Sequence, residues 1–514
     1  MNDSRAWRQA LGIIAGTTLL RLVLGAVVPL FPDETYYWDW SRTLMAGYFD
    51  HPPLIAVLIR GGTAIFGPHA FGVRFFPILA GGVAALALAL ASRELAGDDA
   101  GRLAALVFAS LPLANLGLVL ATPDAPMLCA VACAVYAVVR ALLASQASLH
   151  REAVRWWLYA GVGMGLAMAS KYTSVLIPFG LAVAFVTHPR LQNKFGERGP
   201  YVAVIAATLV FAPVIWWNAT HDWVSFRFQL GHGFGEPKGG ALGALNREVQ
   251  LVGGQVGLVS PILFFFIVRA VKRGFAPTPD GLRLTLSLVA TCCIALFVYS
   301  ASRRSVEANW PALAYIPAII LLATDPPLTW RGERWLRGGL WLGAALSLII
   351  YIHTIVRVLP IPPRQDQVAK AFGWELLAEN VDRWRESIRS RASFGASDLH
   401  VAAERYQDAS ELAFHLKDRP RVYSLNLTGR ANQYDLWDTF PERAAVGATL
   451  LLVLDDEPGD PRVIRKLACC FQRIDARPSV ALVRGEAVSA RKRVWVLQSW
   501  SGEWPRRDQP FPWE

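Results

Sequence analysis

Long apolar runs separated by short polar segments dominate the first 360 residues of the chain. A helix needs about 20 apolar residues to cross the hydrocarbon core of a bilayer, and eleven runs approach that length. We place them at about residues 9–30, 71–91, 102–120, 125–144, 157–170, 173–187, 200–217, 251–271, 284–300, 309–323 and 339–358. The pattern therefore predicts a polytopic α-helical membrane protein with about eleven transmembrane helices, of which the fifth and sixth are short.

The pattern changes after the proline-rich segment 360–363. Beyond it the apolar runs are short and alternate with charged residues, which is typical of a water-exposed domain. Helical periodicity covers residues 365–391 and 408–416, and extended runs cover residues 421–425, 449–454, 479–483 and 494–497. We predict two domains: a transmembrane module over residues 1–359, with juxtamembrane helices in its outer loop 31–70, and a soluble α/β domain over residues 360–514.

Basic residues are distributed unevenly between the two sides of the predicted membrane module. The loops on the side of the N-terminus hold 17 Lys and Arg residues, and the opposite loops between the spans hold 8. Cytoplasmic loops are enriched in Lys and Arg. We therefore predict a bacterial inner-membrane protein with a cytoplasmic N-terminus and a periplasmic C-terminal domain.

The amino-acid composition also indicates a membrane protein. Hydrophobic residues make up 54% of the chain and charged residues 18%, which excludes an ordinary soluble protein. Attraction to anionic membrane lipid accounts for the net charge of +11, so nucleic acid is not an expected partner. The six cysteines occur in pairs whose spacing fits neither a disulfide framework nor a zinc site.

The polar segment 31–58 carries the most unusual chemistry. It holds the acidic residues Asp33, Glu34, Asp39 and Asp50, followed by His51, among many Tyr, Trp and Phe side chains. Carboxylates beside a bilayer are costly, so they indicate a function at the membrane surface. Some of them also have a purely structural alternative, because Asp33 could be the N-cap of one helix and Asp50 or His51 the cap of the next.

A helix beginning near Asp33 would be amphipathic. Its aromatic and aliphatic stripe consists of Tyr36, Tyr37, Trp40 and Leu44. The opposite, polar face consists of Thr35, Asp39 and Arg42. This division is typical of a helix that lies flat on a membrane surface.

Further charged residues lie at the outer ends of other predicted spans. In the turn before the fourth span, Thr122 is a natural N-cap and Asp124 could simply interact with the helix dipole. Lys171 lies in the segment SKYT, and Arg303 and Arg304 precede the segment EANW. A lone cation at a helix end usually reaches toward the lipid headgroups. Here the cations gather on the side that the positive-inside rule depletes, which favours binding of an anion such as phosphate.

A carboxylate opposite cationic phosphate ligands is the arrangement that transfer from a lipid phosphate requires. The carboxylate takes a proton from the acceptor hydroxyl as this hydroxyl attacks the anomeric carbon of the sugar. The cations stabilise the departing phosphate. No cofactor is required by this chemistry, and the chain has no DxD pair and no nucleotide loop. Asp33, Asp50 and His51 could still hold a divalent metal.

Five segments of the chain together resemble one family. In order across about residues 1–325, they are PDETYYWDWS, GYFDHPPL, TPDAP, SKYT and VEANWPALAY. They resemble bacterial members of the GT-C glycosyltransferases, in the protein O-mannosyltransferase-like family that includes the lipid A aminoarabinose transferases. In the C-terminal part, the segments that resemble the outer domain of some bacterial relatives are ASELAFHL, RPRVYSLNL and GRANQYDLW.

The resemblance implies roles for individual residues. An acidic residue of the first outer loop is the proposed base in such enzymes, and it corresponds to Asp33, with Glu34 beside it. Asp124 would orient the acceptor or the base. The family often has a lysine that contacts donor phosphate where this chain has Asp50-His51, so the resemblance does not imply an aminoarabinose donor. The predicted catalytic residues are Asp33, Glu34 and Asp124. The predicted donor-phosphate contacts are His51, Lys171, Arg303 and Arg304. The other predicted substrate contacts are Tyr37, Asp50, Tyr172, Glu307 and Asn309.

These residues predict an inverting glycosyltransferase that moves a sugar from a polyprenyl-phosphate donor to a periplasmic acceptor. The acceptor is lipid A, lipopolysaccharide, another glycan or a protein. A membrane transporter or lipid flippase is the first alternative, but such proteins place ionisable residues near the bilayer midplane, where the predicted spans have almost none. A non-enzymatic scaffold is the second alternative, and it would not need acidic and basic residues on one face.

Overall fold

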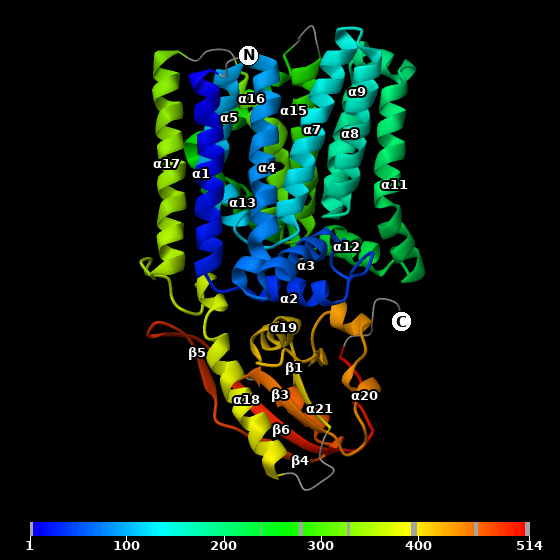
Figure 1. Ribbon diagram of the computed structural model, residues 1–514, viewed down its shortest axis with the longest axis vertical. Coiled ribbons are helices and arrows are strands. Elements are labelled where there is room, and N and C mark those ends of the chain that lie inside the picture. The colour runs from blue at the N-terminus through cyan, green and yellow to red at the C-terminus, as the bar shows by residue number, and fades with distance from the viewer. Residues whose placement is uncertain are drawn as a thin grey trace. The chain divides into compact units, whose positions relative to one another are not determined.

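The computed structural model describes residues 4–237, 239–276, 281–325, 329–391, 398–456 and 461–508. The chain forms two compact units, whose elements Figure 1 labels. Unit 1 consists of Met1–Val27, Leu44–Gly47 and His51–Val356. Unit 2 consists of Val28–Thr43, Tyr48–Asp50 and Arg357–Glu514. The predicted domain boundary at residue 359 assigned residues 28–43 to the membrane module, whereas their contacts lie within unit 2.

Unit 1 is helical. Among the described residues, six helices are long and apolar enough to cross a membrane: α1 (Arg5–Val27), α4 (Ala70–Ala96), α7 (Asp124–Gln146), α11 (Arg198–Thr220), α15 (Leu282–Arg303) and α17 (Trp330–Ile355). The pair α13 (Gly240–Val259) and α14 (Pro261–Gly274) adds a seventh if it counts as one span. The other helices of unit 1 are α3 (Leu54–Phe66), α5 (Asp98–Ser110), α6 (Pro112–Gly117), α8 (His150–Met168), η1 (Tyr172–Val175), α9 (Leu176–Thr187), α10 (Pro189–Gln192), η2 (Asn193–Gly196), α12 (Val224–Phe234), η3 (Trp310–Ala314) and α16 (Tyr315–Ala323).

The multi-pass membrane character predicted from the hydrophobic pattern is confirmed, with differences in detail. Six predicted runs correspond to the six long helices. The runs 173–187 and 309–323 are shorter apolar helices that each begin with a 3₁₀ turn. The run 102–120 divides into α5 and α6 at Leu111, because Pro112 follows and begins a new helix.

The predicted span 251–271 is interrupted. α13 and α14 meet at an angle of 105°. Ser260 between them has φ 72°, outside the helical region, and its hydroxyl accepts a hydrogen bond from the amide of Leu263. Pro261 disfavours a helical conformation of the residue before it, so the break is local in origin. The prediction of one continuous span is corrected here.

Two buried arginines depart from the expectation that the spans carry almost no charge. Arg21 in α1 is 1% exposed, and its Nη2 donates to Oδ1 of Asn115 at 3.0 Å. Arg74 in α4 is fully buried and donates to the carbonyl of Gly25 at 3.1 Å. Polar groups inside a membrane protein need such partners, because lipid supplies none.

Close helix packing positions the end of α8, next to which Lys171 lies. α8 lies beside α7 and α11 (Figure 1). Gly161 and Gly165 of α8 are four residues apart on one face, and a Cβ atom at Gly161 would approach the carbonyl oxygen of Ala203 in α11 to 2.3 Å. Small residues at this spacing allow two backbones to approach closely in a membrane.

Unit 2 is an α/β unit, as predicted. Its mixed sheet has the order β2-β1-β3-β6-β4, with β5 paired to β6. β1 is parallel to β2 and β3, and β6 is antiparallel to β3, β4 and β5. The strands are β1 (Leu399–Ala403), β2 (Val422–Ser424), β3 (Thr449–Asp455), β4 (Phe471–Ala476), β5 (Val480–Arg484) and β6 (Ala487–Trp500). The helices are α2 (Pro32–Arg42), η4 (Val368–Ala371), α18 (Trp374–Arg391), α19 (Tyr406–His415), η5 (Gln433–Leu436), α20 (Phe440–Arg443) and α21 (Pro461–Leu467).

The strands differ in how well their residue patterns predict them. β3 is a continuous apolar run whose five central residues are buried. β4 has the sequence FQRIDA and β1 the sequence LHVAA, and neither was predicted. β4 lies at one end of the sheet order and is mostly exposed. Edge strands carry charged residues and lack a buried face, so their pattern is weak.

Helix α2 packs into unit 2 through the face that a membrane-surface helix would leave in water. The Thr35 hydroxyl lies 3.0 Å from the hydroxyl of Ser410 in α19. Asp39 accepts a hydrogen bond from the Tyr434 hydroxyl at 2.7 Å, and Arg42 donates to the carbonyl of Arg419 at 2.9 Å. The predicted polar face is therefore a buried protein contact, which corrects the interpretation of α2 as a helix lying flat on a membrane.

Candidate active site

Asp33 lies in the first turn of α2, directly after Pro32, and its side chain is exposed. A carboxylate is favoured at this end of a helix by the helix dipole. Surrounding protein atoms remove part of its water and raise the pKa of Asp33, and the nearby charge of Asp50 raises it further. The charges of Arg430 and Lys370 lower the pKa. Remaining solvent contact limits the rise.

Asp50 is buried and held by side chains of unit 2. It accepts hydrogen bonds from the hydroxyl of Tyr36 at 2.7 Å and from Nη1 of Arg430 at 2.8 Å. The Tyr36 hydroxyl in turn accepts a hydrogen bond from the amide of Gln433 at 2.8 Å. α3 begins only at Leu54, with Pro53 as its N-cap. Asp50 is therefore not a helix cap but an anchor within unit 2.

Glu34 and Tyr37 have structural partners. Glu34 is fully buried, and its Oε2 accepts a hydrogen bond from the amide of Phe31 at 3.0 Å. This contact closes the start of α2. The Tyr37 ring is 9% exposed and lies edge-on to Trp40, with 4.9 Å between ring centroids. Of the acidic residues in α2, Asp33 is thus the one that is exposed and available to a substrate.

Replacing Arg430 by Met is expected to move the acidic limb of the pH–rate profile to higher pH. A base must be deprotonated to act, so turnover falls as the pH drops through its pKa. Arg430 lowers the pKa of Asp33, so its removal raises that pKa. Arg430→Lys keeps the charge and serves as the matched control. An unchanged acidic limb in the folded Met variant would show that Arg430 does not influence the pKa of the proposed base, Asp33.

A second cluster lies in unit 1 and joins three segments that are distant in sequence. Oδ1 of Asp124 accepts a hydrogen bond from the ammonium group of Lys171 at 2.7 Å, and Oδ2 accepts one from Nδ2 of Asn309 at 2.9 Å. The side chains of Asp124 and Lys171 are about one-tenth exposed. Pro123 holds the N-cap position of α7, so the expectation that Thr122 caps this helix is wrong. The partners of Asp124 give it a role beyond the helix dipole.

Tyr172 directly follows Lys171 in the chain, and the segment that begins at His51 is tied to the same region by a backbone hydrogen bond. The Tyr172 hydroxyl shares a hydrogen bond of 2.8 Å with the Ser225 hydroxyl and accepts one from Asn218 at 3.3 Å. His51 begins the segment that leads into α3, and the amide of Leu54 donates to the carbonyl of Ala169 at 3.1 Å. This bond ties the segment to the end of α8, two residues before Lys171.

Arginines gather at the C-terminal end of α15. Nε of Arg303 donates to the carbonyl of Gly235 at 3.2 Å. The guanidinium group of Arg304 lies against the same glycine, and its buried Nε has no hydrogen-bond partner among the described residues. Arg247, which the sequence analysis did not select, donates to the carbonyls of Ala301 and Ser302 at 2.9 Å each. Glu307 is exposed beyond this end.

An apolar cavity of about 380 Å³ lies within unit 1. Phe211, Phe226 and Leu230 are among the side chains that line it. The polar residues Tyr172 and Ser300 also reach it, together with Trp310. They lie within three residues of Lys171, Arg303 and Asn309 respectively, so the segments that carry these polar groups also line the cavity.

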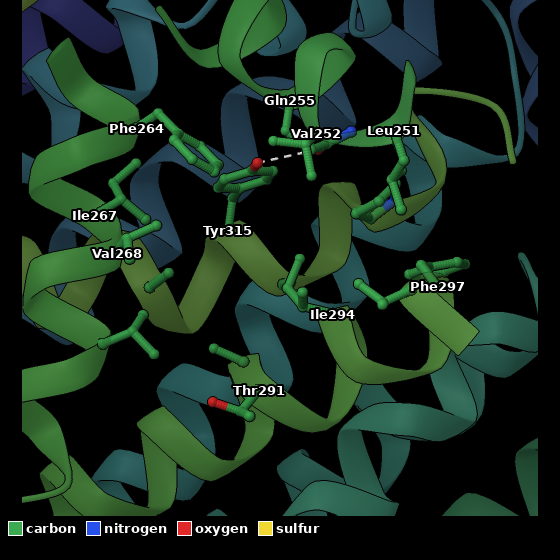
Figure 2. A pocket seen from close by; sticks show the side chains of 16 residues that line it. Leu251, Val252, Gln255, Phe264, Ile267, Val268, Thr291, Ile294, Phe297 and Tyr315 are labelled. Carbon is green, nitrogen blue, oxygen red and sulfur yellow. Dashed lines mark hydrogen bonds between the residues drawn. The ribbon is translucent and has the colours of Figure 1, made fainter. Parts of the chain in front are cut away.

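A second apolar cavity, of about 250 Å³, lies between α13, α14, α15 and α16. Figure 2 shows Tyr315 pointing toward Gln255 across it, with a hydrogen bond of 3.0 Å from the tyrosine hydroxyl to Oε1. The Gln255 amide also donates to the carbonyl of Ala308, directly before Asn309. The bend between α13 and α14 is thereby linked to the segment that carries Asn309.

The predicted site residues therefore fall into two groups. Asp33, Glu34, Tyr37 and Asp50 lie in unit 2, and the others lie in unit 1. The structure brings Asp124, Lys171 and Asn309 into direct contact. Arg430, Gln433 and Arg247 were missed. The segment GRANQYDLW, which contains Arg430 and Gln433, was the one signal for the first two, because it resembles an outer domain of bacterial relatives. Among the described residues, no group of three or more His, Cys, Asp or Glu side chains is placed to hold a metal ion.

Comparison with known proteins shows which proteins this chain resembles. The sequence model described as dolichyl-phosphate-mannose-protein mannosyltransferase matches residues 50–217. The fold is similar to the crystal structure of ArnT from Cupriavidus metallidurans in the apo state, with a TM-score of 0.65 and 16% identity over 96% of this chain and 98% of that one. ArnT from the same organism bound to undecaprenyl phosphate gives a TM-score of 0.63 at 16% identity, over 94% and 97% of the two chains. The chain is thus similar in part of its sequence to this mannosyltransferase family, and its fold is similar to that of the ArnT structures.

Two individual proteins have sequences similar to this chain. The chain is 29% identical over 434 residues to the lipid A galacturonosyltransferase RgtD of Rhizobium johnstonii, which covers 83% of this chain and 87% of the relative. It is also 29% identical over 204 residues to the undecaprenyl phosphate-alpha-4-amino-4-deoxy-L-arabinose arabinosyl transferase of Pseudomonas aeruginosa. That match covers 37% of this chain and 36% of the relative.

Proposed function

We propose that this chain is an inverting glycosyltransferase that moves a sugar from a polyprenyl-phosphate donor to lipid A or a related glycolipid. RgtD, whose name describes a lipid A galacturonosyltransferase, supports this acceptor because it matches over most of its length. The arabinosyl transferases and the ArnT structure bound to undecaprenyl phosphate support the donor class. Distribution of Lys and Arg supports an inner-membrane location with a cytoplasmic N-terminus and periplasmic chemistry.

The observation that carries this proposal is the apolar cavity of unit 1, which is lined by segments that also carry cationic residues. A polyprenyl phosphate is a long hydrocarbon with one anionic end, and the cavity offers aromatic and aliphatic walls for the hydrocarbon. Lys171, Arg303 and Arg304 lie in the segments adjoining the same cavity, and His51 lies in the segment tied to the end of α8. Cations of this kind bind phosphate and stabilise the charge that grows as it departs.

In the proposed reaction, the oxygen of an acceptor hydroxyl attacks the anomeric carbon of the donor sugar. The bond between that carbon and the phosphate oxygen breaks, and the polyprenyl phosphate leaves with the electron pair. Asp33 takes the proton of the hydroxyl. Asp124, held by Lys171 and Asn309, orients the acceptor or the base. Attack opposite the departing phosphate inverts the configuration of the anomeric carbon.

A transfer assay with the purified full-length protein tests the proposal. Polyprenyl phosphate carrying a radiolabelled sugar is supplied with lipid A in detergent, and labelled lipid A is measured. We expect transfer, release of polyprenyl phosphate and activity that persists in EDTA. Absence of labelled product with several sugars and acceptors would refute the glycosyl-transfer proposal, and loss of activity in EDTA would show that a metal takes part.

Replacing Arg304 by Gln is expected to raise the KM for the donor by about tenfold to a hundredfold, because a charged hydrogen bond is lost. The buried Nε without a partner among the described residues is the reason for choosing this arginine. The KM for the acceptor should not change. Arg331→Gln, at an exposed arginine in the first turn of α17, is the matched control. Equal donor KM values for the two variants would remove Arg304 from the phosphate site.

A further inference from the structure

A polar cavity of about 430 Å³ lies within unit 2, between the C-terminal end of α2 and the segment 421–438. Its lining includes Asp39 and Arg42 from α2. From the segment 421–438 it includes Arg421, Tyr434, Trp437 and Asp438. This volume lies within the range of pockets that hold small ligands.

The charged groups in this cavity are held by one another and by the fold. Asp39 is 8% exposed and accepts hydrogen bonds from Arg42 at 3.0 Å and from Tyr434 at 2.7 Å. The Arg42 guanidinium also lies over the Trp38 ring, 5.1 Å from its centroid. A nitrogen of Arg421 lies 3.5 Å from a carboxylate oxygen of Asp438. Side chains fixed in this way lose little freedom when a ligand binds, which favours affinity.

The chemistry of the lining selects a class of ligand. Two guanidinium groups face two carboxylates, so the cavity is balanced in charge and offers both hydrogen-bond donors and acceptors. A lipid chain would meet these charges without partners, at a high cost. A phosphate is also disfavoured, because its negative charge would be repelled by both carboxylates. A saccharide suits this lining, because its hydroxyl groups both donate and accept, and its ring carbons can lie against the half-buried indole of Trp437.

We propose that this cavity binds a sugar unit of the acceptor glycan, outside the unit that receives the transferred sugar. This proposal rests on the proposed glycosyl-transfer function and adds an acceptor subsite to it. α2 carries both the cavity residue Asp39 and the proposed base Asp33. Six residues of helix rise separate them, about 9 Å. A rigid helix thus links recognition of the acceptor to the base, and binding of a remote sugar unit contributes to positioning the reacting hydroxyl.

Kinetics of Arg421→Gln test the subsite. The KM for the acceptor should rise about tenfold, as expected for the loss of one charged hydrogen bond. The donor KM should not change. Arg462→Gln is the matched control, because Arg462 is also exposed in unit 2 and lies 3.9 Å from an aspartate oxygen, that of Asp508. Trp437→Leu, with its melting temperature checked, removes the aromatic surface and should act in the same direction.

A binding measurement separates this subsite from the transfer reaction. Saturation-transfer NMR with the full-length protein in detergent uses a soluble glucosamine disaccharide as the ligand. Wild type and Arg462→Gln should transfer signal to the disaccharide, and Arg421→Gln should not. Binding by a wild type that shows no transfer would support the subsite and refute the proposed function. An unchanged acceptor KM together with unchanged NMR signal in Arg421→Gln would overturn the subsite, as would an equal rise in the donor KM.

Discussion

Replacing Asp33 by Asn is expected to reduce turnover by about 10²–10⁴-fold, the contribution that a general base makes. Asn has nearly the same shape as Asp and keeps a polar group at the start of α2, so the fold should persist. Its amide cannot take the proton of the acceptor hydroxyl. The measurement is transfer of labelled sugar from polyprenyl phosphate by the purified protein, with the melting temperature recorded in parallel.

Two controls distinguish loss of the base from loss of a helix-terminal charge. Glu34→Gln keeps a carbonyl oxygen that can accept the hydrogen bond from Phe31, and it should retain most activity. Asp99→Asn removes an exposed carboxylate from the first turn of α5, and it should have no effect. Retained turnover in folded Asp33→Asn, or equal loss in Glu34→Gln, would assign the base to another residue.

Replacing Lys171 by Met is expected to destabilise the protein by about 3–5 kcal/mol, the cost of leaving one partner of a buried ion pair without the other. Met fills a similar volume, so the cost comes from the Asp124 carboxylate, which keeps only its contact with Asn309. Thermal unfolding of the purified protein in detergent measures this loss. Donor binding should also weaken, because a cation next to the cavity residue Tyr172 in the chain is removed.

The double variant Lys171→Met/Asp124→Asn separates the stability effect from the catalytic one. It has no unpaired buried charge, so it should recover most of the lost stability. Its turnover should remain low, since neither the cation nor the carboxylate is present. A double variant that is as unstable as Lys171→Met, or a Lys171→Met variant that is as stable as wild type, would contradict the role given to this ion pair.

The membrane module could be predicted in outline because lipid imposes a simple condition on the sequence. Each long helix satisfies its own backbone hydrogen bonds and needs an apolar surface, so the six long helices coincide with predicted runs. Pro261 alone did not predict the bend at Ser260, because prolines also occur inside continuous helices such as α4 and α11. Their effect depends on neighbouring groups that accept or replace the lost hydrogen bond.

The candidate site was predictable as a set of residues and not as a set of contacts. Motifs and membrane topology selected Asp33, Asp124 and Lys171 as groups on one side of the membrane. That Asp124 binds both Lys171 and Asn309 follows from the packing of three segments up to 185 residues apart. The same limit applies to the proposed base Asp33, because the segment GRANQYDLW resembled an outer domain without revealing that Arg430 lies near this carboxylate.

The sequence by itself determined that this chain is a multi-pass membrane protein with a C-terminal α/β part, and that its short motifs resemble those of the GT-C glycosyltransferases. Apolar run length and short motifs are local properties, and they carry this information directly. Only the tertiary structure decided that α2 belongs with the C-terminal segment, and that Asp50 is held by Arg430 at a separation of 380 residues. Contacts of this kind depend on how the whole unit packs, because the polar face of α2 can be satisfied equally by water or by protein until the fold supplies the partner.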